Sequence, residues 1–263
     1  MLRSMYSGIS GMKNFQTKLD VIGNNISNVN TYGFKKGRVV FKDLVSQSIA
    51  GANAPANGRG GVNPKQVGLG AQLSAIDTIH TEGSTQTTGR TLDLAVSGDG
   101  FFQVTDGTNT YYTRAGNFYM DENGDLVNSD GLYLVGDGGN INVPTEATSL
   151  SIGAGGVVSY IEDGNLVADQ TIELAKFPNS SGLIKVGENL YQQSANSGDP
   201  VTGVPGDQES GMGKLVAGAL EMSNVDLSEE FSEMIVAQRG FQANTRIITT
   251  SDEILQELMS MKR

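Results

Sequence analysis

The two ends of the chain carry apolar residues at helical spacing, which restricts both ends to long amphipathic helices. From Leu2 to Val29 the apolar positions are separated by steps of three or four residues, the spacing of one face of an α-helix. Four of them are also seven residues apart, as a coiled-coil seam requires: Met5, Met12, Leu19 and Ile26.

The C-terminal end shows the same pattern. Asp226 or Ser228 can cap a helix there, and Glu229 and Glu230 suit the positive end of its dipole. The companion seam positions Gln238, Thr245 and Asp252 are polar, which favours packing among several helices over a two-stranded coiled coil. The apolar residues recur every seven positions: Leu220, Leu227, Met234, Phe241, Ile248 and Leu255.

Three glycines weaken the first helix. Gly8, Gly11 and Gly23 each cost roughly 1 kcal/mol relative to alanine, so this helix needs neighbours to be stable. The neighbours can come from the same chain, as a helical hairpin packed under the middle of the molecule, or from other chains, as an intermolecular bundle. Periodicity favours the hairpin, whereas the glycines and polar seam positions favour the bundle.

The middle of the chain is predicted to be β-structure. Glycine makes up 35 of the 263 residues, and short apolar runs alternate with Asp-Gly and Asn-Gly dipeptides. The stretch MDENGDLV, residues 120–127, predicts a hairpin turn. Residues 46–70 are small and polar, and are predicted to form a loop or extended linker.

The predicted fold is therefore α+β, with paired, coiled-coil-like terminal helices, a central all-β domain and extended linkers. We expect residues 1–45 and 215–263 to form one helical domain, because the two helices leave the same middle domain. Residues 46–75 are expected to be a linker, and residues 76–214 the β-domain.

The composition argues against several classes of partner and site. Lysine and arginine number 18 against 29 aspartates and glutamates, a net charge of −11 that disfavours nucleic acid and anionic membranes as partners. There is no cysteine, and His80 is the single histidine, which argues against thiolate chemistry, a catalytic triad and a histidine metal cluster. We expect His80 to be an ordinary strand or loop residue.

No motif indicates an enzyme. The turn around Asp121, Asn123 and Asp125 resembles half of a calcium loop, but its glycine is misplaced and the bidentate glutamate is missing. P-loop, dinucleotide-binding and nucleophile-elbow motifs are absent from the sequence. A glycosidase-like carboxylate pair stays possible, but no pair stands out. We expect no catalysis, cofactor, metal or small-molecule substrate.

Three stretches in order carry a family resemblance. LDVIGNNISNVNTYGF (19–34), the pair SGDGFFQV and YTRAGNF within 97–118, and the block from GALEMSNVDL to the last helix resemble the bacterial flagellar rod and hook proteins. The resemblance covers both ends and the start of the middle.

The resemblance implies an axial structural protein whose copies stack into a helical tube, with paired terminal helices inside and the β-domain outside. It implies other axial proteins (rod, hook cap and hook–filament junction) and the flagellar type III export apparatus as partners. The N-terminus lacks the apolar core of a cleaved signal peptide, which alone would suggest a cytoplasmic protein. The resemblance instead implies export to the flagellum without cleavage.

Within the family, the spelling of the terminal motifs favours a short hook protein, the flexible joint that transmits torque to the filament. The length instead suggests the distal rod protein, the rigid drive shaft of the basal body, which is the alternative. A more remote alternative is a secreted β-domain adhesin on a helical stalk, although no aromatic or charged cluster marks a ligand surface.

The asparagines near the end of the first helix are predicted to satisfy its last carbonyls and to bridge to neighbouring subunits. Gly33 would permit an outward turn, and Phe34 would anchor the emerging segment. The expected N-terminal interface is Met5, Ile9, Met12, Leu19, Ile22, Asn24, Asn25, Ile26, Asn28, Thr31, Gly33 and Phe34. The expected C-terminal interface is Leu220, Leu227, Phe231, Met234, Ile235, Gln238, Phe241, Thr245, Ile248, Leu255 and Leu258.

Overall fold

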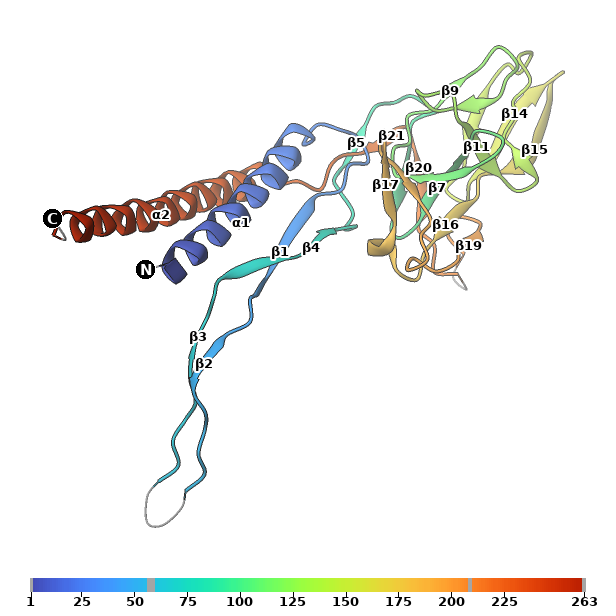
Figure 1. Ribbon diagram of the computed structural model, residues 1–263. Helices are drawn as coiled ribbons and strands as arrows, with labels where there is room; N and C mark the ends of the chain where they lie inside the picture. The colour runs from blue at the N-terminus through green and yellow to red at the C-terminus, as the bar shows by residue number, and fades with distance from the viewer. Residues whose placement is uncertain (1, 56–59, 208–209, 262–263) are drawn as a thin grey trace. The chain divides into compact units, whose positions relative to one another are not determined.

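The computed structural model describes residues 2–55, 60–207 and 210–261. The chain divides into two compact units, which are described separately below. The first contains residues 1–27, 37–77 and 226–263, and the second contains residues 28–36 and 78–225. The α+β class, with a long helix at each end and a β-rich middle, is confirmed (Figure 1).

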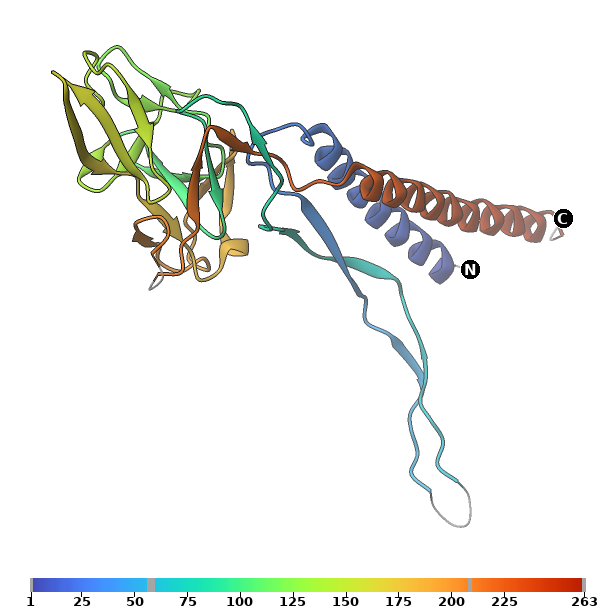
Figure 2. The same cartoon turned by 180° about the vertical axis from the view of Figure 1, so that it is seen from behind.

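The first unit holds both long helices. Helix α1 is Leu2–Ser27 and helix α2 is Leu227–Ser260, and Figures 1 and 2 show them side by side. Asp226 is the N-cap of α2, because its Oδ1 accepts hydrogen bonds from the backbone N–H groups of Ser228 (2.8 Å) and Glu229 (3.4 Å). The predicted start of this helix is therefore correct at Asp226.

A two-stranded β-ribbon completes the first unit (Figure 1). Strand β1 (Gly37–Asp43) pairs with β4 (Ala71–Thr78), and β2 (Gln47–Ala50) pairs antiparallel with β3 (Lys65–Val67). The segment expected to be a linker therefore contains paired strands. Residues 56–59 of that segment lie outside the described residues.

The second unit is almost entirely β-structure, and the predicted hairpin at residues 120–127 is present as the antiparallel pair β9–β10. Its largest sheet has ten strands, with the path β17-β18-β8-β7-β11-β10-β9 and with β12, β16 and β19 as side branches. These strands are β7 (Phe101–Thr105), β8 (Thr110–Thr113), β9 (Tyr119–Met120), β10 (Leu126–Val127), β11 (Tyr133–Gly136), β12 (Gly139–Asn140), β16 (Leu174–Lys176), β17 (Ile184–Gly187), β18 (Leu190–Gln192) and β19 (Val201–Gly203).

Smaller sheets surround this one. A three-stranded antiparallel sheet follows the order β13-β14-β15, and two further pairs join β6 to β20 and β5 to β21. A single turn of 3-10 helix, Ser180–Gly182, precedes β17. The remaining strands are β5 (Thr85–Thr87), β6 (Leu94–Ser97), β13 (Leu150–Ile152), β14 (Val157–Glu162), β15 (Asn165–Thr171), β20 (Lys214–Ala217) and β21 (Ala219–Glu221).

The apolar core of the molecule lies in the second unit. Phe102 and Phe118 pack edge to face, with ring centroids 5.3 Å apart, among aliphatic side chains from β6, β7, β10, β11 and β16. The first unit buries far fewer large side chains; Ile22 and Ala237 are its buried apolar residues among those described. The helices are therefore much more exposed than the β-core.

The observed boundaries differ from the predicted ones at both helices. Residues 28–36 belong to the β-rich unit, whereas they were expected to belong to the helical domain. Residues 215–225 also belong to the β-rich unit, because β20 and β21 pair with β6 and β5. The ribbon 37–77 belongs with the helices.

Candidate assembly site

Close packing of α1 on α2 depends on glycine. A Cβ on Gly240 would lie 2.4 Å from the Phe15 ring, and one on Gly11 would lie 2.8 Å from the Asn244 side chain. Both distances are shorter than side chains tolerate, so the two glycines let the partner side chains approach the helix backbone. Gly11, which was predicted only to weaken α1, therefore also has a packing role.

A polar cluster holds the other end of the helix pair. The Asn25 amide nitrogen donates to Gly37 O (2.9 Å) and to Glu230 Oε2 (3.1 Å), and its oxygen accepts from Gly37 N (2.9 Å). Asn25 and Glu230 are both buried. One side chain therefore joins the end of α1, the start of β1 and the first turn of α2. Nearby, Lys18 Nζ lies 3.0 Å from Glu233 Oε2.

This geometry corrects one part of the asparagine hypothesis. Asn25 was expected to satisfy the last carbonyls of α1, but its amide instead binds the backbone of Gly37 and the carboxylate of Glu230. The reason is that Ile22 and Asn25 share the buried face of α1, three residues apart, so the amide points into the unit and away from the helix end.

The other predicted N-terminal residues fall into two groups. On α1, Ile22 is buried, Ile9 and Asn24 are exposed, and Met5, Met12, Leu19 and Ile26 are half-buried. Beyond the helix, Asn28, Thr31, Gly33 and Phe34 lie in the β-rich unit.

The chain turns at Gly33, as the sequence predicts, whereas the outward direction of the turn stays a prediction. Its φ is +68°, and a Cβ there would lie 2.4 Å from the backbone nitrogen of Ala115, so no other residue fits without displacement. Phe34 is buried next to it, with the Lys185 ammonium 5.0 Å from its ring centroid. Phe34 therefore anchors the segment, as expected. Asn28 Oδ1 accepts a hydrogen bond from the Thr31 hydroxyl at 3.2 Å.

The predicted C-terminal residues include one error. Leu220 was placed on the last helix, but it lies in strand β21, where it is buried and pairs with Gln86. The helix begins only at Leu227, after the Asp226 cap. The seven-residue spacing from Leu220 to Leu227 is therefore a coincidence of two different elements.

The buried side of α2 also differs from the expected one. Glu230, Ala237 and Ser251 are buried, whereas Gln238, Thr245 and Asp252, expected to complete the seam, are exposed. Thr245 still lies at the edge of the contact, with Oγ1 3.4 Å from Met12 Sδ. The predicted seam residues Met234, Phe241, Ile248 and Leu255 are all half-buried.

An apolar surface remains open on α2. Phe231, Ile235 and Val236 are each at least half exposed near the start of the helix, and Leu227 is also exposed. Toward the other end, the exposed apolar residues are Ile247, Ile254, Leu258 and Met259. Exposed apolar residues that lie close together on one element are typical of a surface that contacts another molecule.

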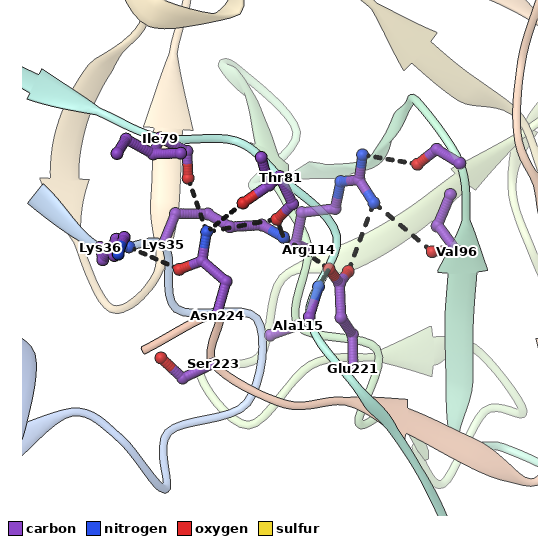
Figure 3. Close-up of polar contacts among 12 residues, drawn as sticks. Lys35, Lys36, Ile79, Thr81, Val96, Arg114, Ala115, Glu221, Ser223 and Asn224 are labelled. Carbon is purple, nitrogen blue, oxygen red and sulfur yellow. Dashed lines mark hydrogen bonds and ion pairs between the residues drawn. The ribbon is translucent and has the colours of Figure 1, made fainter. Parts of the chain in front are cut away.

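The β-rich unit contains a buried ionic cluster, shown in Figure 3. The Glu221 carboxylate lies between Lys35 Nζ (2.5 Å) and Arg114 Nη1 (3.3 Å), and all three side chains are almost completely buried. Lys35 also donates to Thr81 O at 2.7 Å. Loss of hydration lowers the pKa of Lys35, which the Glu221 charge and hydrogen bond partly oppose.

This ionic cluster fixes the path of the chain around residues 28–36. Gly33 N donates to Glu221 O (2.9 Å), and Lys36 N donates to the Asn224 side chain (2.8 Å), which in turn donates to Ile79 O (2.9 Å). The segment that follows α1, residues 28–36, is thus tied to the segment that precedes α2, within the second unit (Figure 3).

Sequence reasoning missed the buried charges. Lys35, Arg114, Glu221 and Glu230 were not selected, because charged residues are ordinarily exposed and their partners are 107 to 205 residues away along the chain. The available signal was weak: Lys35 directly follows the proposed anchor Phe34, and Glu221 lies within an otherwise apolar run.

His80 lies in the loop after β4, as expected for an ordinary residue. It contacts the rings of Phe101 and Tyr191, at centroid distances of 5.5 and 5.4 Å. Among the described residues, no group of three or more histidine, cysteine or acidic side chains is arranged to hold a metal ion. Neither α1 nor α2, over its described length, is apolar enough to span a membrane.

Comparison with known families agrees with this layout. Three family models match in order: the flagella basal body rod protein at residues 5–35, the flagellar hook protein FlgE/F/G D1 domain at 95–160, and the flagellar basal body rod FlgEFG protein C-terminal region at 216–261. A flagellar basal-body rod protein, FlgG of Bacillus subtilis, is 60% identical over 266 residues, covering all of both chains.

The chain belongs to the flagellar rod and hook protein family. Proteins of this family are structural components of the flagellum and not enzymes. Another member, FlgG of Borreliella burgdorferi, is 40% identical over 270 residues, covering all of both chains. The flagellar hook protein FlgE of the same bacterium is 31% identical, in an alignment of 443 residues that also covers both chains completely.

The expected preference for a hook protein is not supported. The rod proteins align with this chain over nearly its own length at higher identity, whereas the hook protein needs 443 aligned positions for a chain of 263 residues. The motif spelling does not separate rod from hook proteins, because the family models that match residues 95–160 and 216–261 describe FlgE and FlgG together. The rod alternative fits better.

Proposed function

We propose that the chain is a subunit of the flagellar basal-body rod, in its distal part, where copies stack into a rigid tube that transmits torque. The observation that carries this proposal is the 60% identity to a rod protein across the full length of both chains. The alignments with hook proteins extend over 443 and 465 positions, so these hook proteins contain long segments that the 263 residues of this chain do not have.

In this proposal, the helix pair is the assembly core. The terminal helices pair in a coiled-coil-like manner within each copy and line the inside of the tube, and the β-rich unit faces outward. Support comes from the open apolar side of α2: Phe231, Ile235 and Val236 are left in water by a single copy and would be covered by neighbouring copies. The predicted interface residues of α1 and α2 are part of this proposal. Leu220 is not, because it lies in β21.

The β-ribbon is proposed to reach adjacent copies. An isolated two-stranded ribbon is at best marginally stable in water, and this one exposes Val45, Ile49 and Ile76. Contacts with neighbouring copies would cover these side chains and complete the open strand edges. In a rod such contacts would lock neighbours together, and so would stiffen the tube.

The proposal also sets the route and destination of the chain. We infer that it leaves the cell through the flagellar type III export apparatus without a cleaved signal peptide, and joins other axial proteins in the basal body. The family model that matches residues 5–35 supports this, since α1 is then part of the structure that the family shares.

Electron microscopy of concentrated purified protein tests the proposal. A rod subunit is expected to give straight, stiff tubes, whereas a hook subunit would give curved ones. Ile235→Glu should abolish the tubes, because it places a charge on the open side of α2, while leaving the monomer folded. Leu166→Glu is the control, because it places the same charge at an exposed apolar residue of β15. The Leu166→Glu protein should still assemble. Curved tubes, or tubes formed equally well by Ile235→Glu, would contradict the proposal.

A further inference from the structure

A small pocket in the β-rich unit is separate from the helix face discussed above. Its volume is about 220 Å³, and the side chains around it include His80, Phe101, Arg114, Lys176, Phe177 and Ser180. Two aromatic rings thus form part of the wall, and two cationic side chains reach it. The volume is large enough for a carboxylate or a phosphate group.

Two residues that line this pocket each have one buried polar atom without a hydrogen-bond partner. Arg114 is 2% exposed; its Nη1 donates to Glu221 Oε2 and Val96 O, and its Nη2 donates to Gly98 O at 2.8 Å. Its Nε, however, has no acceptor, and His80 Nδ1 also lacks a partner. A buried guanidinium N–H without an acceptor is costly, and so it points to a missing acceptor.

The charges around the pocket favour an anion as that acceptor. Lys35 and Arg114 share the single carboxylate of Glu221, so this buried cluster carries one excess positive charge. Lys185 adds a third cation that acts on His80. In a protein of net charge −11, this is a local region of positive potential.

Two carboxylates oppose this arrangement. The charge of Glu82, an exposed residue, acts on Lys35. Asp99 is at the edge of the pocket, 3.6 Å from Lys176 Nζ. The side chain of Asp99 is 72% exposed, so water and salt weaken the effect of its charge. Arg114 is buried, so its charge acts more strongly. Lys176 also donates to Gly211 O at 3.0 Å, which holds its ammonium group near the rim.

We propose that the pocket binds one oxyanion, a carboxylate or phosphate group, through Arg114 Nε and the Lys176 ammonium. The anion is either free in solution or an aspartate or glutamate side chain of a second copy; the second source rests on the proposed function, since it requires assembled copies. Bound there, it would neutralise the excess charge of the Lys35–Glu221–Arg114 cluster.

The single histidine makes the test direct. His80 gives the only imidazole signals of the chain, so NMR of the full-length monomer, titrated with acetate or with inorganic phosphate at matched ionic strength, reports occupancy of the pocket. Saturable shifts of these signals are expected with either anion and not with chloride. Lys176→Met should weaken the apparent affinity by about fivefold, because one charged contact is lost.

Lys214→Met is the matched control, since Lys214 is an exposed lysine of β20 that does not line the pocket. Its affinity should equal that of the unchanged protein. If His80 does not respond to either anion, or if Lys176→Met binds as well as Lys214→Met, the proposal is overturned. Because this experiment uses monomer, a failure to form tubes would not affect its result.

Assembled protein distinguishes the two sources of the anion. If the shifted imidazole signals appear in tubes prepared without added acetate or phosphate, a carboxylate of a second copy fills the pocket. If tubes show the unshifted signals and respond to added phosphate, the free anion is the ligand. Tubes in which neither condition produces the shift would contradict an oxyanion site in the assembled state.

Discussion

Asn25 shows how one buried amide can organise the ends of three elements. Its side chain makes both hydrogen bonds that a paired strand would make to Gly37, and a third to Glu230. The amide therefore takes the place of a neighbouring β-strand at the start of β1. Replacement by any side chain without both a donor and an acceptor leaves partly buried backbone groups of Gly37 without this partner.

The first prediction compares Asn25→Ala with Asn24→Ala. Asn25→Ala should lower the free energy of unfolding of the helical unit by about 1–3 kcal/mol, because the Gly37 backbone and the Glu230 carboxylate lose their partner. Asn24 is exposed, so its replacement should have a much smaller effect. Urea denaturation followed by circular dichroism at helical wavelengths measures both. Equal losses would show that burial of Asn25 is not the cause.

The second prediction concerns the buried ionic cluster. Glu221→Gln leaves Lys35 and Arg114 buried together without a carboxylate, so the β-rich unit should lose about 3–5 kcal/mol of stability. Glu122→Gln is the control, because Glu122 is exposed in the β9–β10 turn. Chemical denaturation of both variants, followed by tyrosine fluorescence, gives the difference. A Glu221→Gln protein as stable as the control would refute this account of the cluster.

The third prediction is a dependence on pH. Burial, and then the charges of Lys35, Arg114 and Lys185, lower the pKa of His80 to about 4 from its usual 6.5. Between these values the unfolded chain binds a proton that the folded chain does not, so stability should fall as the pH drops from about 6.5 to 4. For this group alone the loss is about 3 kcal/mol.

His80→Leu isolates this effect, because the chain has no other histidine. The difference in unfolding free energy between the unchanged protein and His80→Leu should vary across that pH window and be constant above pH 7. Denaturation curves at half-unit pH steps measure it. A difference that stays constant from pH 7 to 4 would show that His80 has an ordinary pKa.

At the scale of elements, the helix pair depends on where glycine is used. Gly240 accommodates Phe15 and Gly11 accommodates Asn244, whereas a Cβ on Gly23 would meet nothing within 4 Å. The three positions are equally unfavourable for helix formation, but only two of them have a packing reason. The packing role of these glycines can therefore be tested by making the same substitution at a glycine with a close contact and at one without.

The fourth prediction is that Gly23→Ala stabilises the helical unit by roughly 0.5–1 kcal/mol, through helix propensity alone. Gly240→Ala gains the same propensity but forces the Phe15 ring out of its place, so it should be neutral or destabilising. Thermal unfolding of the two variants, followed by circular dichroism, compares them. If both substitutions stabilise equally, Phe15 has room to move and the close contact has no energetic importance.

The elements also show which parts of the fold the sequence can predict. Both terminal helices, the Asp226 cap and the β9–β10 hairpin follow from local spacing and turn residues, and all are present. The positions of α2 that complete its buried side were not predicted correctly. Steps of three and of four residues both continue a helical stripe, so the spacing alone does not decide between neighbouring positions. Ala237 and Ser251, with small side chains, are buried where their larger neighbours Gln238 and Asp252 are not.

Long-range contacts between individual residues could not be predicted, although the pairing of the two terminal helices could. Lys35 and Glu221 are 186 residues apart, and nothing near either residue indicates the other. The ribbon strands β2 and β3 were not predicted, for a different reason. Most of their residues are polar and all are exposed, so they lack the apolar alternation by which strands are recognised. Leu220 was misplaced because β21 happens to continue the spacing of α2.

At the scale of the whole molecule, stability is distributed unevenly. The β-rich unit contains the apolar core, and the helical unit leaves much of α2 exposed. We expect the helices to fray in the free subunit and to become ordered when copies assemble. This expectation depends on the proposed polymer, and so it can be tested on the monomer and the tube separately.

The fifth prediction follows from that difference. Limited proteolysis of free subunits should cut first within roughly the first 30 and last 40 residues, at the least stable part of the structure, and leave the β-rich unit intact. The same protease should spare these ends in assembled tubes. Mass spectrometry of the fragments identifies the cleavage sites. Equal protection of the ends in both samples would argue against helices that are completed by neighbours.

The pairing of α1 with α2 also has a consequence for the order of folding. The first helix to leave the ribosome contacts the last one, with Asn25 and Glu230 separated by 205 residues. Until almost the entire polypeptide has emerged, α1 lacks its helical partner and can contact only the nearby ribbon, while the β-rich unit can already close its sheets. A growing chain therefore lacks the helical partner of α1 for most of its synthesis, and the helical unit can be completed only after the β-rich unit.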